Sequence, residues 1–508
     1  MRTSANRMRI DYERIPFPSM REGRGLTPAL FALTIITLLS SCSRPTNPAL
    51  AITHVTVIDA TGSPPKPDMT LLIAGERIAT LGPSGSTAIP RGARSLDATG
   101  KFLIPGLADM HVHLTGAGAG EPSGSRQFIL SLLLANGVTT VRDMGGNVED
   151  VLRLRNEVTS GIRPGPQIFF TGPYLDGDPP AYQPSIVVKS ASEARAAVDR
   201  LAIEGVDFIK TQSRLSREAY FAIAQESKQL HIRFVGHVPD RISATEASQA
   251  GQAGIEHLTG ILLACSSKEE DLRRARFAPD PGNETQAQAH ARDRAWRREL
   301  LDTYSPQKAD ALFHAFVTNG TWQVPTFPIM VHFGFVTPKT NLLLDPRVRY
   351  VPQNVRKIWL QGVQAQLENY SEADFTLREE IVKHSLEIVG KMQAAGVRIM
   401  AGTDIAAPNV FPGFSLHEDI SFLVEAGLTP MQALQAATKN SAEFLGKLKV
   451  QGTVEQGKLA DLLLLDSNPL DDIHNTQKIR ALVLRGKLWD RTALDGLLAS
   501  VEKFAGAN

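Results

Sequence analysis

Two histidines lie two residues apart at the end of an apolar segment, in the sequence His111-Val112-His113 that follows residues 107–110. In a β-strand, side chains two residues apart point to the same side, so both imidazoles would face one space. A neutral imidazole is a common ligand of divalent metal ions, but it also occurs as a hydrogen-bonded core residue. The pair by itself therefore leaves a metal site and a structural role open.

Four further side chains that are compatible with metal binding lie where other strands are predicted to end: Lys210, His237, His257 and Asp404. The carboxyl ends of the strands of a parallel barrel open on one face, so six side chains from five strands would converge there. A single histidine at a strand end is usually a hydrogen-bonded core residue, and a single aspartate after Gly-Thr is usually a helix N-cap. It is the convergence that indicates a metal centre.

The elements that must position these residues are short apolar segments that alternate with helix-like ones. The predicted strands cover residues 137–143, 167–171, 206–210, 233–237, 254–257 and 397–402, and a further apolar run over residues 107–110 leads into His111-Val112-His113. Repeated strand-then-helix order predicts parallel strands joined by right-handed crossovers. We therefore predict an α/β fold in which residues 104–445 form a (β/α)8 TIM barrel.

Both ends of the chain have a different pattern, with short alternating segments between glycine-containing turns. Such segments are typical of antiparallel strands, and they occur over residues 51–103 and 446–495. We predict that the two ranges meet in one small β-sandwich domain. A third region, about 266–386, is long, charged and mostly helix-like, with one strand candidate over residues 322–326. An insertion of this size in a barrel loop would lie over the barrel mouth and shape a substrate pocket.

The first 42 residues contain a basic stretch, a short apolar run over residues 26–39, and small residues before Cys42. This order resembles a bacterial lipoprotein signal peptide, which is cleaved so that the cysteine becomes lipidated. It predicts a protein anchored in the bacterial cell envelope through lipid on Cys42 and a linker over residues 43–50, facing the periplasm or the exterior. An uncleaved anchor is the alternative, because the segment before Met20 is unusually long, and the start codon, Met1 or Met20, stays open.

The composition excludes several classes of partner and site. The 508 residues include 54 Lys and Arg against 53 Asp and Glu, a net charge of +1, and we find no basic patch for nucleic acid. Two cysteines exclude a disulfide scaffold and a four-cysteine zinc site, so a metal must be held by His, Asp, Glu or Lys. The Gly-x-Ser-x-Gly motif of serine hydrolases is absent from the sequence.

The chain resembles the amidohydrolase superfamily, in particular its imidazolonepropionase-like and prolidase-like hydrolases. The motifs that carry the resemblance occur in order at residues 104–113 (IPGLADMHVH), 137–143 (GVTTVRD), 207–210 (DFIK), 255–257 (IEH), 401–404 (AGTD), 416–418 (LHE) and 457–462 (GKLADL). The resemblance covers nearly the whole chain after the signal segment. It implies a (β/α)8 barrel, a small β domain built from both ends, and a hydrolytic metal centre.

The resemblance further implies two divalent ions, for which Zn²⁺ is expected, although Mn²⁺, Co²⁺ and Fe²⁺ use the same ligands. One ion would be held by His111, His113 and Asp404 and the other by His237 and His257, with Lys210, carboxylated by CO2 to a carbamate, as the bridge. Imidazolonepropionase uses one metal, so the presence of Lys210 favours the prolidase-like branch.

The implied reaction is hydrolysis of an amide bond in a small substrate such as a dipeptide or an N-acyl amino acid. A metal-activated water would attack the carbonyl, and Asp404 would take its proton and pass it to the leaving amine. The alternatives are a cyclic-amide (imidazolone-type) hydrolase with one metal and an unmodified Lys210, and a non-catalytic binding lipoprotein. The binding lipoprotein would have lost a ligand or the acid/base, yet every expected position is filled.

Three weaker candidates for substrate binding are His417, Tyr182 and Arg142. Each has an equally ordinary structural interpretation: a histidine at a helix start, an exposed loop tyrosine, and an arginine in an ion pair. The substrate itself cannot be read from the motifs, because specificity resides in the loops and the insertion. The sequence also leaves open whether the chain forms a homo-oligomer.

Overall fold

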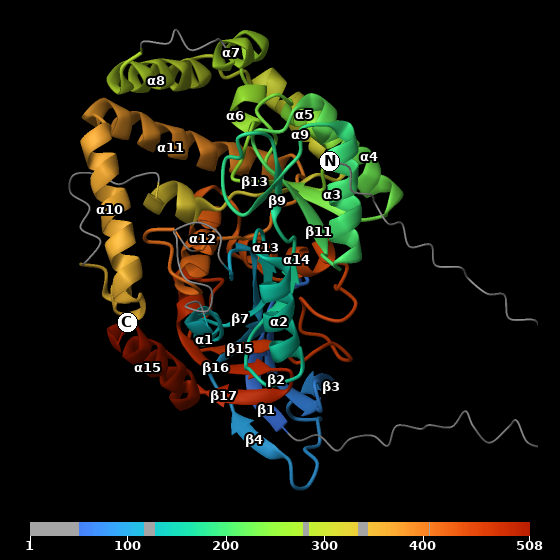
Figure 1. Ribbon diagram of the computed structural model, residues 1–508. Coiled ribbons are helices and arrows are strands. Elements are labelled where there is room, and N and C mark those ends of the chain that lie inside the picture. The colour runs from blue at the N-terminus through green and yellow to red at the C-terminus, as the bar shows by residue number, and fades with distance from the viewer. Residues whose placement is uncertain (1–49, 116–126, 278–283, 334–343, 406, 508) are drawn as a thin grey trace, which may run out of the picture. The chain divides into compact units, whose positions relative to one another are not determined.

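A computed structural model describes residues 50–115, 127–277, 284–333, 344–405 and 407–507 of the protein (Figure 1). Cys42, the predicted signal segment and all but the last residue of the predicted linker lie outside the described residues. Within the described ranges, we find no helix that is both long and apolar enough to cross a membrane.

Strands from both ends of the chain form one sheet. Its members are β1 (Leu50–Val57), β2 (Lys66–Ala74), β3 (Arg77–Pro83), β4 (Arg94–Asp97), β5 (Phe102–Pro105), β15 (Leu462–Leu465), β16 (Ile479–Leu484) and β17 (Lys487–Asp490). The order is β17-β16-β15-β5-β1-β2-β3, and β4 pairs with β1. The antiparallel pairing of β15 with β5 joins the two ends, in the register Leu462 to Pro105. Because these strands belong to a single sheet, the predicted two-sheet sandwich is not confirmed.

The middle of the chain alternates strands and helices, as predicted. One sheet has the order β6 (Leu107–Val112), β7 (Val138–Asp143), β8 (Gln167–Phe170), and a second has the order β10 (Ser185–Val187), β9 (Tyr174–Asp176), β11 (Phe208–Thr211), β12 (Arg233–Gly236), β13 (Gly254–Glu256), β14 (Trp322–Val324). Every pairing within them is parallel. Helices α1 (Gln127–Ala135), α2 (Val148–Thr159), α3 (Ala191–Ile203), α4 (Arg217–Gln229) and α5 (Ala244–Gln249) lie between successive strands.

The assigned strands of the two parallel sheets do not close into one ring, which differs from the predicted barrel. Backbone hydrogen bonds nevertheless connect their edges: the Asp207 amide donates to the Phe170 carbonyl at 2.9 Å, and the Met400 amide to Gln323 at 2.9 Å. The Met110 amide donates to Ala401 at 3.0 Å. Residues 398–404 thus lie between β14 and β6, but they make only isolated bridges and receive no strand assignment.

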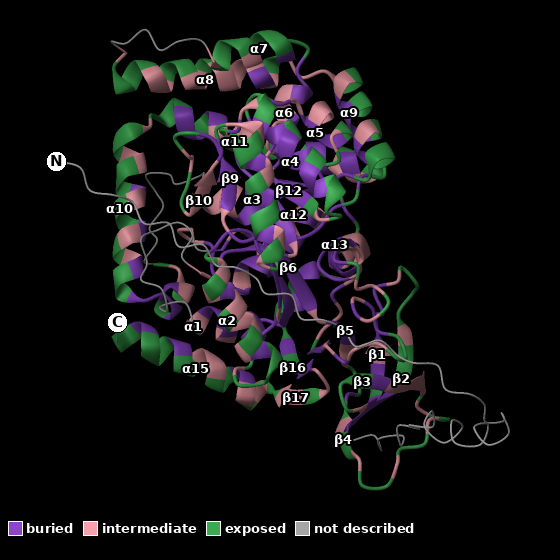
Figure 2. Cartoon of the chain, turned by 45° about the vertical axis from the view of Figure 1, so that its right-hand side comes forward, coloured by how far each residue is buried: buried purple, intermediate pink, exposed green. Residues whose placement is uncertain are grey.

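These strands are apolar because helices cover them, so that both their faces are buried. All six residues of β6 and of β7 are buried. Figure 2 shows buried strands in the interior and exposed outer faces on the helices around them. The remaining helices near the chain end are α12 (Phe414–Glu425), α13 (Pro430–Ala436), α14 (Lys439–Phe444) and α15 (Arg491–Ala507).

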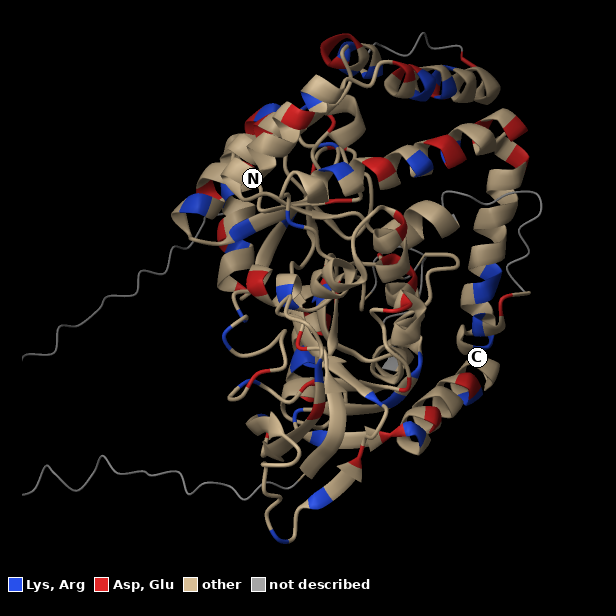
Figure 3. Cartoon of the chain, turned by 180° about the vertical axis from the view of Figure 1, so that it is seen from behind, with Lys and Arg blue, Asp and Glu red and all other residues tan. Residues whose placement is uncertain are grey.

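The range predicted as a helical insertion, 266–386, is divided by β14, which pairs with β13 in the parallel sheet. Before β14 lie α6 (Ile261–Ala264), α7 (Glu269–Arg276), α8 (Gln286–Asp302) and α9 (Pro306–Asn319), and after it lie α10 (Gln353–Asn369) and α11 (Glu372–Ala394). Figure 3 shows charges of both signs along α7, α8 and α11. The charge runs therefore follow helices, as the sequence predicted.

The close approach of α11 to the end of α12 predicts opposite effects for two glycine substitutions. A Cβ at Gly390 would overlap the carbonyl oxygen of Ala426, whereas a Cβ at Gly362 in α10 meets nothing within 4 Å. We expect Gly390→Ala to destabilise the fold by about 1–3 kcal/mol through overpacking. Gly362→Ala should stabilise it by about 0.5–1 kcal/mol, because alanine loses less backbone entropy in a helix. The midpoint of thermal unfolding of each variant measures its effect on stability. Equal midpoints for the two variants would contradict this packing.

Candidate metal centre

The six residues predicted to bind metal follow or end parallel strands. His111 lies in β6, with His113 one residue past its end, and Lys210 lies in β11. His237 directly follows β12, and His257 directly follows β13. Asp404 follows the segment that hydrogen-bonds to β6, and its own amide donates to the His111 carbonyl at 2.7 Å. The carboxyl ends of the strands thus carry all of these side chains, as expected for an active-site face.

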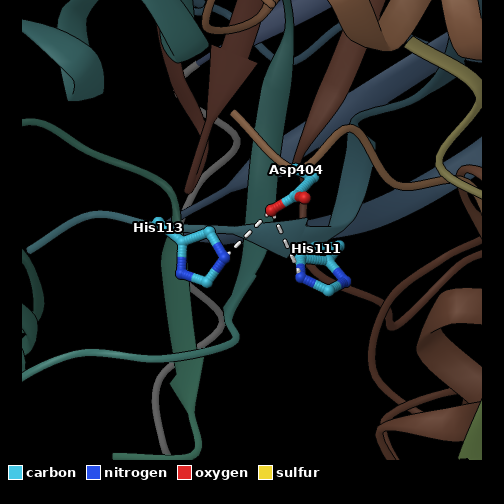
Figure 4. A group of neighbouring side chains, drawn as sticks. All are labelled: His111, His113 and Asp404. Atoms are coloured by element: carbon cyan, nitrogen blue, oxygen red, sulfur yellow. Dashed lines mark ion pairs between the residues drawn. The ribbon is translucent and has the colours of Figure 1, made fainter. Parts of the chain in front are cut away.

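Three of them form a compact group of ligand atoms (Figure 4). Asp404 Oδ1 lies 2.9 Å from His113 Nε2 and 3.5 Å from His111 Nε2. The ligand atoms of these three residues all lie within 4.8 Å of one another. The spacing suits one metal ion bound by two imidazoles and a carboxylate.

His257, His237 and Lys210 lie beside this group. The other carboxylate oxygen of Asp404, Oδ2, is 3.8 Å from His257 Nε2. The ring of His257 lies 4.5 Å from that of His111 and 5.0 Å from that of His237 between centroids. Lys210 is buried, and its Nζ lies 5.8 Å from the ring centroid of Tyr174. The structure therefore brings the four imidazoles together around Asp404.

Each of the four histidines is held through Nδ1 by another protein group. The contacts are His111 to Glu256 Oε2 at 2.8 Å, His113 to the Gly145 carbonyl at 3.1 Å, His237 to Ser213 Oγ at 2.9 Å, and His257 to Thr326 Oγ1 at 2.6 Å. A carboxylate and a carbonyl can only accept, so His111 and His113 donate from Nδ1. Fixing one ring nitrogen in this way also fixes the orientation of the ring.

The two hydroxyl partners also accept. Ser213 donates its proton to the Gln212 side chain at 3.0 Å, and Thr326 donates to the Pro325 carbonyl at 2.6 Å. The protons in the contacts to His237 and His257 therefore come from the imidazoles. A neutral ring held in this way carries its hydrogen on Nδ1 and its lone pair on Nε2.

This arrangement fits a cation. Nε2 of His111, His113 and His257 lies within 4 Å of the Asp404 carboxylate, so lone pairs face negative oxygens. His111 Nε2 is buried and has no hydrogen-bond partner in the described structure. Buried acceptors that face one another are unfavourable unless a proton or a metal ion lies between them. Neutral imidazoles with an orienting partner on the second nitrogen are what a divalent ion requires.

The local electrostatics favour the neutral form of three of these imidazoles, those of His111, His237 and His257. Burial lowers the pKa of His111 and of His237 well below the ordinary value, and the nearby Lys210 adds to the effect. Burial likewise lowers the pKa of His257 to about 4. Protons therefore do not compete with a metal for these nitrogens near neutral pH.

The pKa values of Asp404 and Lys210 are both lowered, which also suits a metal site. Burial by itself would raise the pKa of Asp404, but positive charge at the positions of His257, His113 and Lys210 outweighs it and holds that pKa below the ordinary value. A cation bound at this place would act in the same direction. Burial lowers the pKa of Lys210 to about 8, against the opposing effect of Glu256 and Asp404. The carboxylate is therefore ionised, and a neutral Lys210 amine is accessible at mildly alkaline pH.

Arg142, a candidate for substrate binding, lies in a buried ion pair. Its Nη2 donates to Glu256 Oε1 at 2.7 Å and its Nε to the Met110 carbonyl at 2.7 Å. Both side chains are fully buried, and Glu256 is also the partner of His111. Within the described structure, the hydrogen bonds of Arg142 thus reach the site only through Glu256. This buried ion pair matches the structural interpretation of Arg142 that the sequence left open.

The other two weaker candidates lie in settings that favour a structural interpretation. His417 is buried, and its ring nitrogens contact Thr476 Oγ1 and the Asn136 carbonyl, each at 3.0 Å. Tyr182 is 59 % exposed in the loop between β9 and β10. Tyr174, at the start of β9, is buried, and its ring centroid lies 6.1 Å from that of His113.

Sequence reasoning missed the groups that hold the histidines. Glu256 directly precedes His257 in a quoted motif, and a buried acid beside a predicted ligand could have indicated its role. Ser213 and Thr326 lie in loops after β11 and β14. Nothing in their sequence context distinguishes them from other loop hydroxyls.

Comparison with known proteins supports this description. A sequence model of the amidohydrolase family matches residues 102–273 and 330–489. The fold is similar to that of a bottromycin amidohydrolase, with a TM-score of 0.69 and 22% identity over 90% of each chain. It is also similar to a Xaa-Pro dipeptidase, with a TM-score of 0.61 and 20% identity over 87% of this chain and 99% of the other.

Two curated relatives align with the sequence. Imidazolonepropionase from Klebsiella pneumoniae is 22% identical over 440 residues, which are 83% of this chain and 90% of the relative. Ochratoxinase from Aspergillus niger is 38% identical over 90 residues, which are 17% of this chain. The ochratoxinase match spans only 18% of that protein's length.

The Nδ1 contacts predict that Thr326→Val weakens metal binding. Removing the hydroxyl that orients His257 should lower the affinity for Zn²⁺ about 10- to 100-fold. The measurement is Zn²⁺ binding by metal-stripped protein in competition with a chelator.

The matched control is Thr476→Val, which removes a hydroxyl from the buried His417 away from the centre. Each variant should lose about 1 kcal/mol of stability from the lost hydrogen bond. Only Thr326→Val should lose Zn²⁺ affinity, and an equal loss in Thr476→Val would contradict the assignment.

Proposed function

The chain belongs to the amidohydrolase family and is a hydrolase that acts on carbon–nitrogen bonds, and from this premise we propose that it cleaves an amide bond of a small dipeptide or N-acyl amino acid. The observation that carries the proposal is the group of Nε2 lone pairs that face the Asp404 carboxylate at the strand ends. The likeness to a Xaa-Pro dipeptidase favours peptide-like substrates.

We infer that the site holds two divalent ions, with Zn²⁺ the metal that His and carboxylate ligands suit. Asp404, His111 and His113 would bind one, His237 and His257 would bind the other, and a carbamate on Lys210 would bridge them. The unprotonated Nε2 atoms and the buried position of Lys210 support this arrangement. When bound, such ions polarise a scissile carbonyl and make a water acidic enough to attack it.

The residues of the chain would supply the remaining steps. Asp404 is ionised and can accept the proton of the attacking water, then return it to the nitrogen of the leaving amine. The Glu256 carboxylate keeps His111 in one tautomer and one orientation, and Arg142 keeps Glu256 in place. Such fixed geometry is what lets a proton move between defined atoms without reorganisation of the site.

The arrangement of the parallel strands supports a (β/α)8 barrel as the frame of this site. The candidate ring runs through β6, β7, β8, β11, β12, β13, β14 and residues 398–404. The edges of the assigned sheets are linked by the backbone hydrogen bonds of Asp207, Met400 and Met110. Residues 398–404 would take the place of the eighth strand.

For the location of the protein we propose the bacterial cell envelope, with lipid on Cys42 as its contact with the membrane. The support is the sequence of residues 26–42, with its apolar run and the small residues before the cysteine. A lipid-anchored hydrolase facing the periplasm or the exterior would meet peptides and N-acyl amino acids there.

A cyclic-amide hydrolase with one metal is the second candidate. Imidazolonepropionase from Klebsiella pneumoniae aligns over 83% of this chain. Among the described His, Cys, Asp and Glu side chains, only His111, His113 and Asp404 form a group compact enough for one ion. The metal content of the protein separates the two candidates.

Metal analysis of protein expressed with added bicarbonate tests the inferred bridge. We expect about two ions per chain, falling to about one in Lys210→Ala. Without the carbamate, the second ion would keep only His237 and His257 as ligands, whereas the first would keep three. His417→Gln, at a buried histidine away from the centre, should keep both ions. One ion in the wild-type protein would favour the cyclic-amide candidate instead.

Steady-state hydrolysis of a panel of dipeptides and N-acyl amino acids tests the function itself. We expect Asp404→Asn to lower kcat about 10²- to 10⁴-fold, because the amide cannot accept the proton. Metal analysis of the same variant separates a lost proton acceptor from a lost ion. Near-normal turnover in Asp404→Asn would contradict the acid/base role, and a metal-loaded wild-type protein that hydrolyses none of the panel would contradict the proposed function.

A further inference from the structure

A cavity of about 360 Å³ adjoins the metal centre on the side of His257. His257 itself lines the cavity, and so does Ser213, whose hydroxyl holds His237. The inner end of the cavity is therefore formed by the histidines inferred to bind the second ion and by their supporting groups. A substrate whose amide lies at Asp404 could extend into this space.

Four helices form a second part of the cavity lining. Residues of α6, α7, α8 and α11 line it, and α8 packs against α11 (Figure 1). Of these helices, α7 and α8 lie wholly within the range predicted as an insertion, whereas α6 follows β13 and α11 precedes residues 398–404. Most of the rest of the lining comes from Ser213 and from residues 238–240, 242 and 257–260, which follow the strands that position the histidines. The cavity is thus lined both by inserted helices and by elements of the regular alternation.

The lining is predominantly apolar. It includes Leu258, Leu262, Trp296, Met330, Ile381 and Ile388. Leu262, Trp296, Met330 and Ile381 are only partly buried, which leaves apolar surface that a ligand could cover. Such surface beside a polar centre is typical of a small-molecule site, and the volume is at the lower end of the usual range.

The cations of the lining have partners within the protein. Arg276 and Arg297 share the carboxylate of Asp293, at 2.9 Å and 2.6 Å. Arg273 donates to Glu269 at 2.8 Å and to the carbonyls of Asp240 and Ile242. These ion pairs fix α7 and α8 and offset the positive charge, so the apolar wall is the feature that distinguishes substrates.

We propose that this cavity receives one bulky apolar group of the substrate, an aromatic or branched aliphatic group bonded next to the scissile amide. The inference rests on the proposed function, and it specifies the substrate class of the same site. Burial of such a group removes apolar surface from water, which glycine or acetyl cannot do. We therefore expect substrates with a bulky apolar group to have a kcat/KM about 10- to 100-fold above that of their small analogues.

Two series of N-acyl amino acids test the proposal on the metal-loaded full-length protein. In one series only the amino-acid side chain changes, from glycine to leucine to phenylalanine. In the other only the acyl group changes, from acetyl to 3-methylbutanoyl to benzoyl. A rise in kcat/KM of about 10- to 100-fold in either series is expected. A flat response in both, with glycine substrates hydrolysed, would overturn the proposal and leave the proposed function standing, whereas hydrolysis of neither series would count against the function.

Filling the cavity supplies the second readout. Ile381→Trp on α11 should reduce the ratio of kcat/KM between bulky and small substrates to below about 3-fold, since the tryptophan occupies the space. Leu262→Trp on α6 does the same from another wall and serves if the first variant fails to fold. A merely structural defect would lower all substrates together and keep the ratio.

The matched control is Leu360→Trp, an exposed position on α10 that does not line the cavity. It should leave the ratio and the rates unchanged. A ratio that stays high in both filling variants would overturn the proposal, even if the wild-type protein prefers bulky substrates.

Discussion

The burial of several imidazole nitrogens around one carboxylate is the constraint on which this structure depends. Nε2 of His111, His113 and His257 and the Asp404 carboxylate share one space, an arrangement that is favourable only with a proton or a cation between them. The protein prevents the rings from turning away by holding every Nδ1. The four holding groups come from four places, on β13 and after β7, β11 and β14. Only parallel strands that end at one face bring such distant segments together.

The backbone at this face is also held in unusual conformations. Asp404 and His257 have φ angles of 61° and 57°, in the left-handed region that residues with a Cβ rarely adopt. Such conformations persist only where the surroundings determine them, and they cluster at functional sites. Here the Asp404 amide donates to His111 and the His257 amide donates to Val324. The Asp109 carboxylate accepts from the amide and hydroxyl of Thr403, which fixes the residue before Asp404.

That the candidate metal ligands lie close together could be predicted, because each one ends or follows an apolar strand-like run and parallel strands end at one face. The roles of Ser213 and Thr326 could not, since a hydroxyl in a loop looks the same whether or not an imidazole lies beside it. His417 illustrates the same limit: its partner Asn136 is 281 positions away in the chain. Residues 322–326 were expected as a strand, but the pairing of Trp322–Val324 with β13 in the parallel sheet could not be read from the sequence. Residues 397–402 were also expected as a strand, but in the structure Ile399 makes only an isolated bridge to Gln323.

The candidate metal ligands lie at strand ends, whereas inserted helices line part of the cavity. This difference affects how the protein can differ from its relatives. Buried contacts fix the proposed metal ligands. A substitution of Glu256 would leave the fully buried Arg142 without its carboxylate partner, which costs folding free energy. The apolar side chains of the cavity wall can change at a lower cost in stability. Several of them are partly exposed, and none of them forms an ion pair with the groups that hold the histidines. The helices of the wall are held together by their own ion pairs around Asp293 and Glu269. Under the proposed function, substitutions in the wall would therefore alter which substrate is bound while the proposed metal centre stays the same.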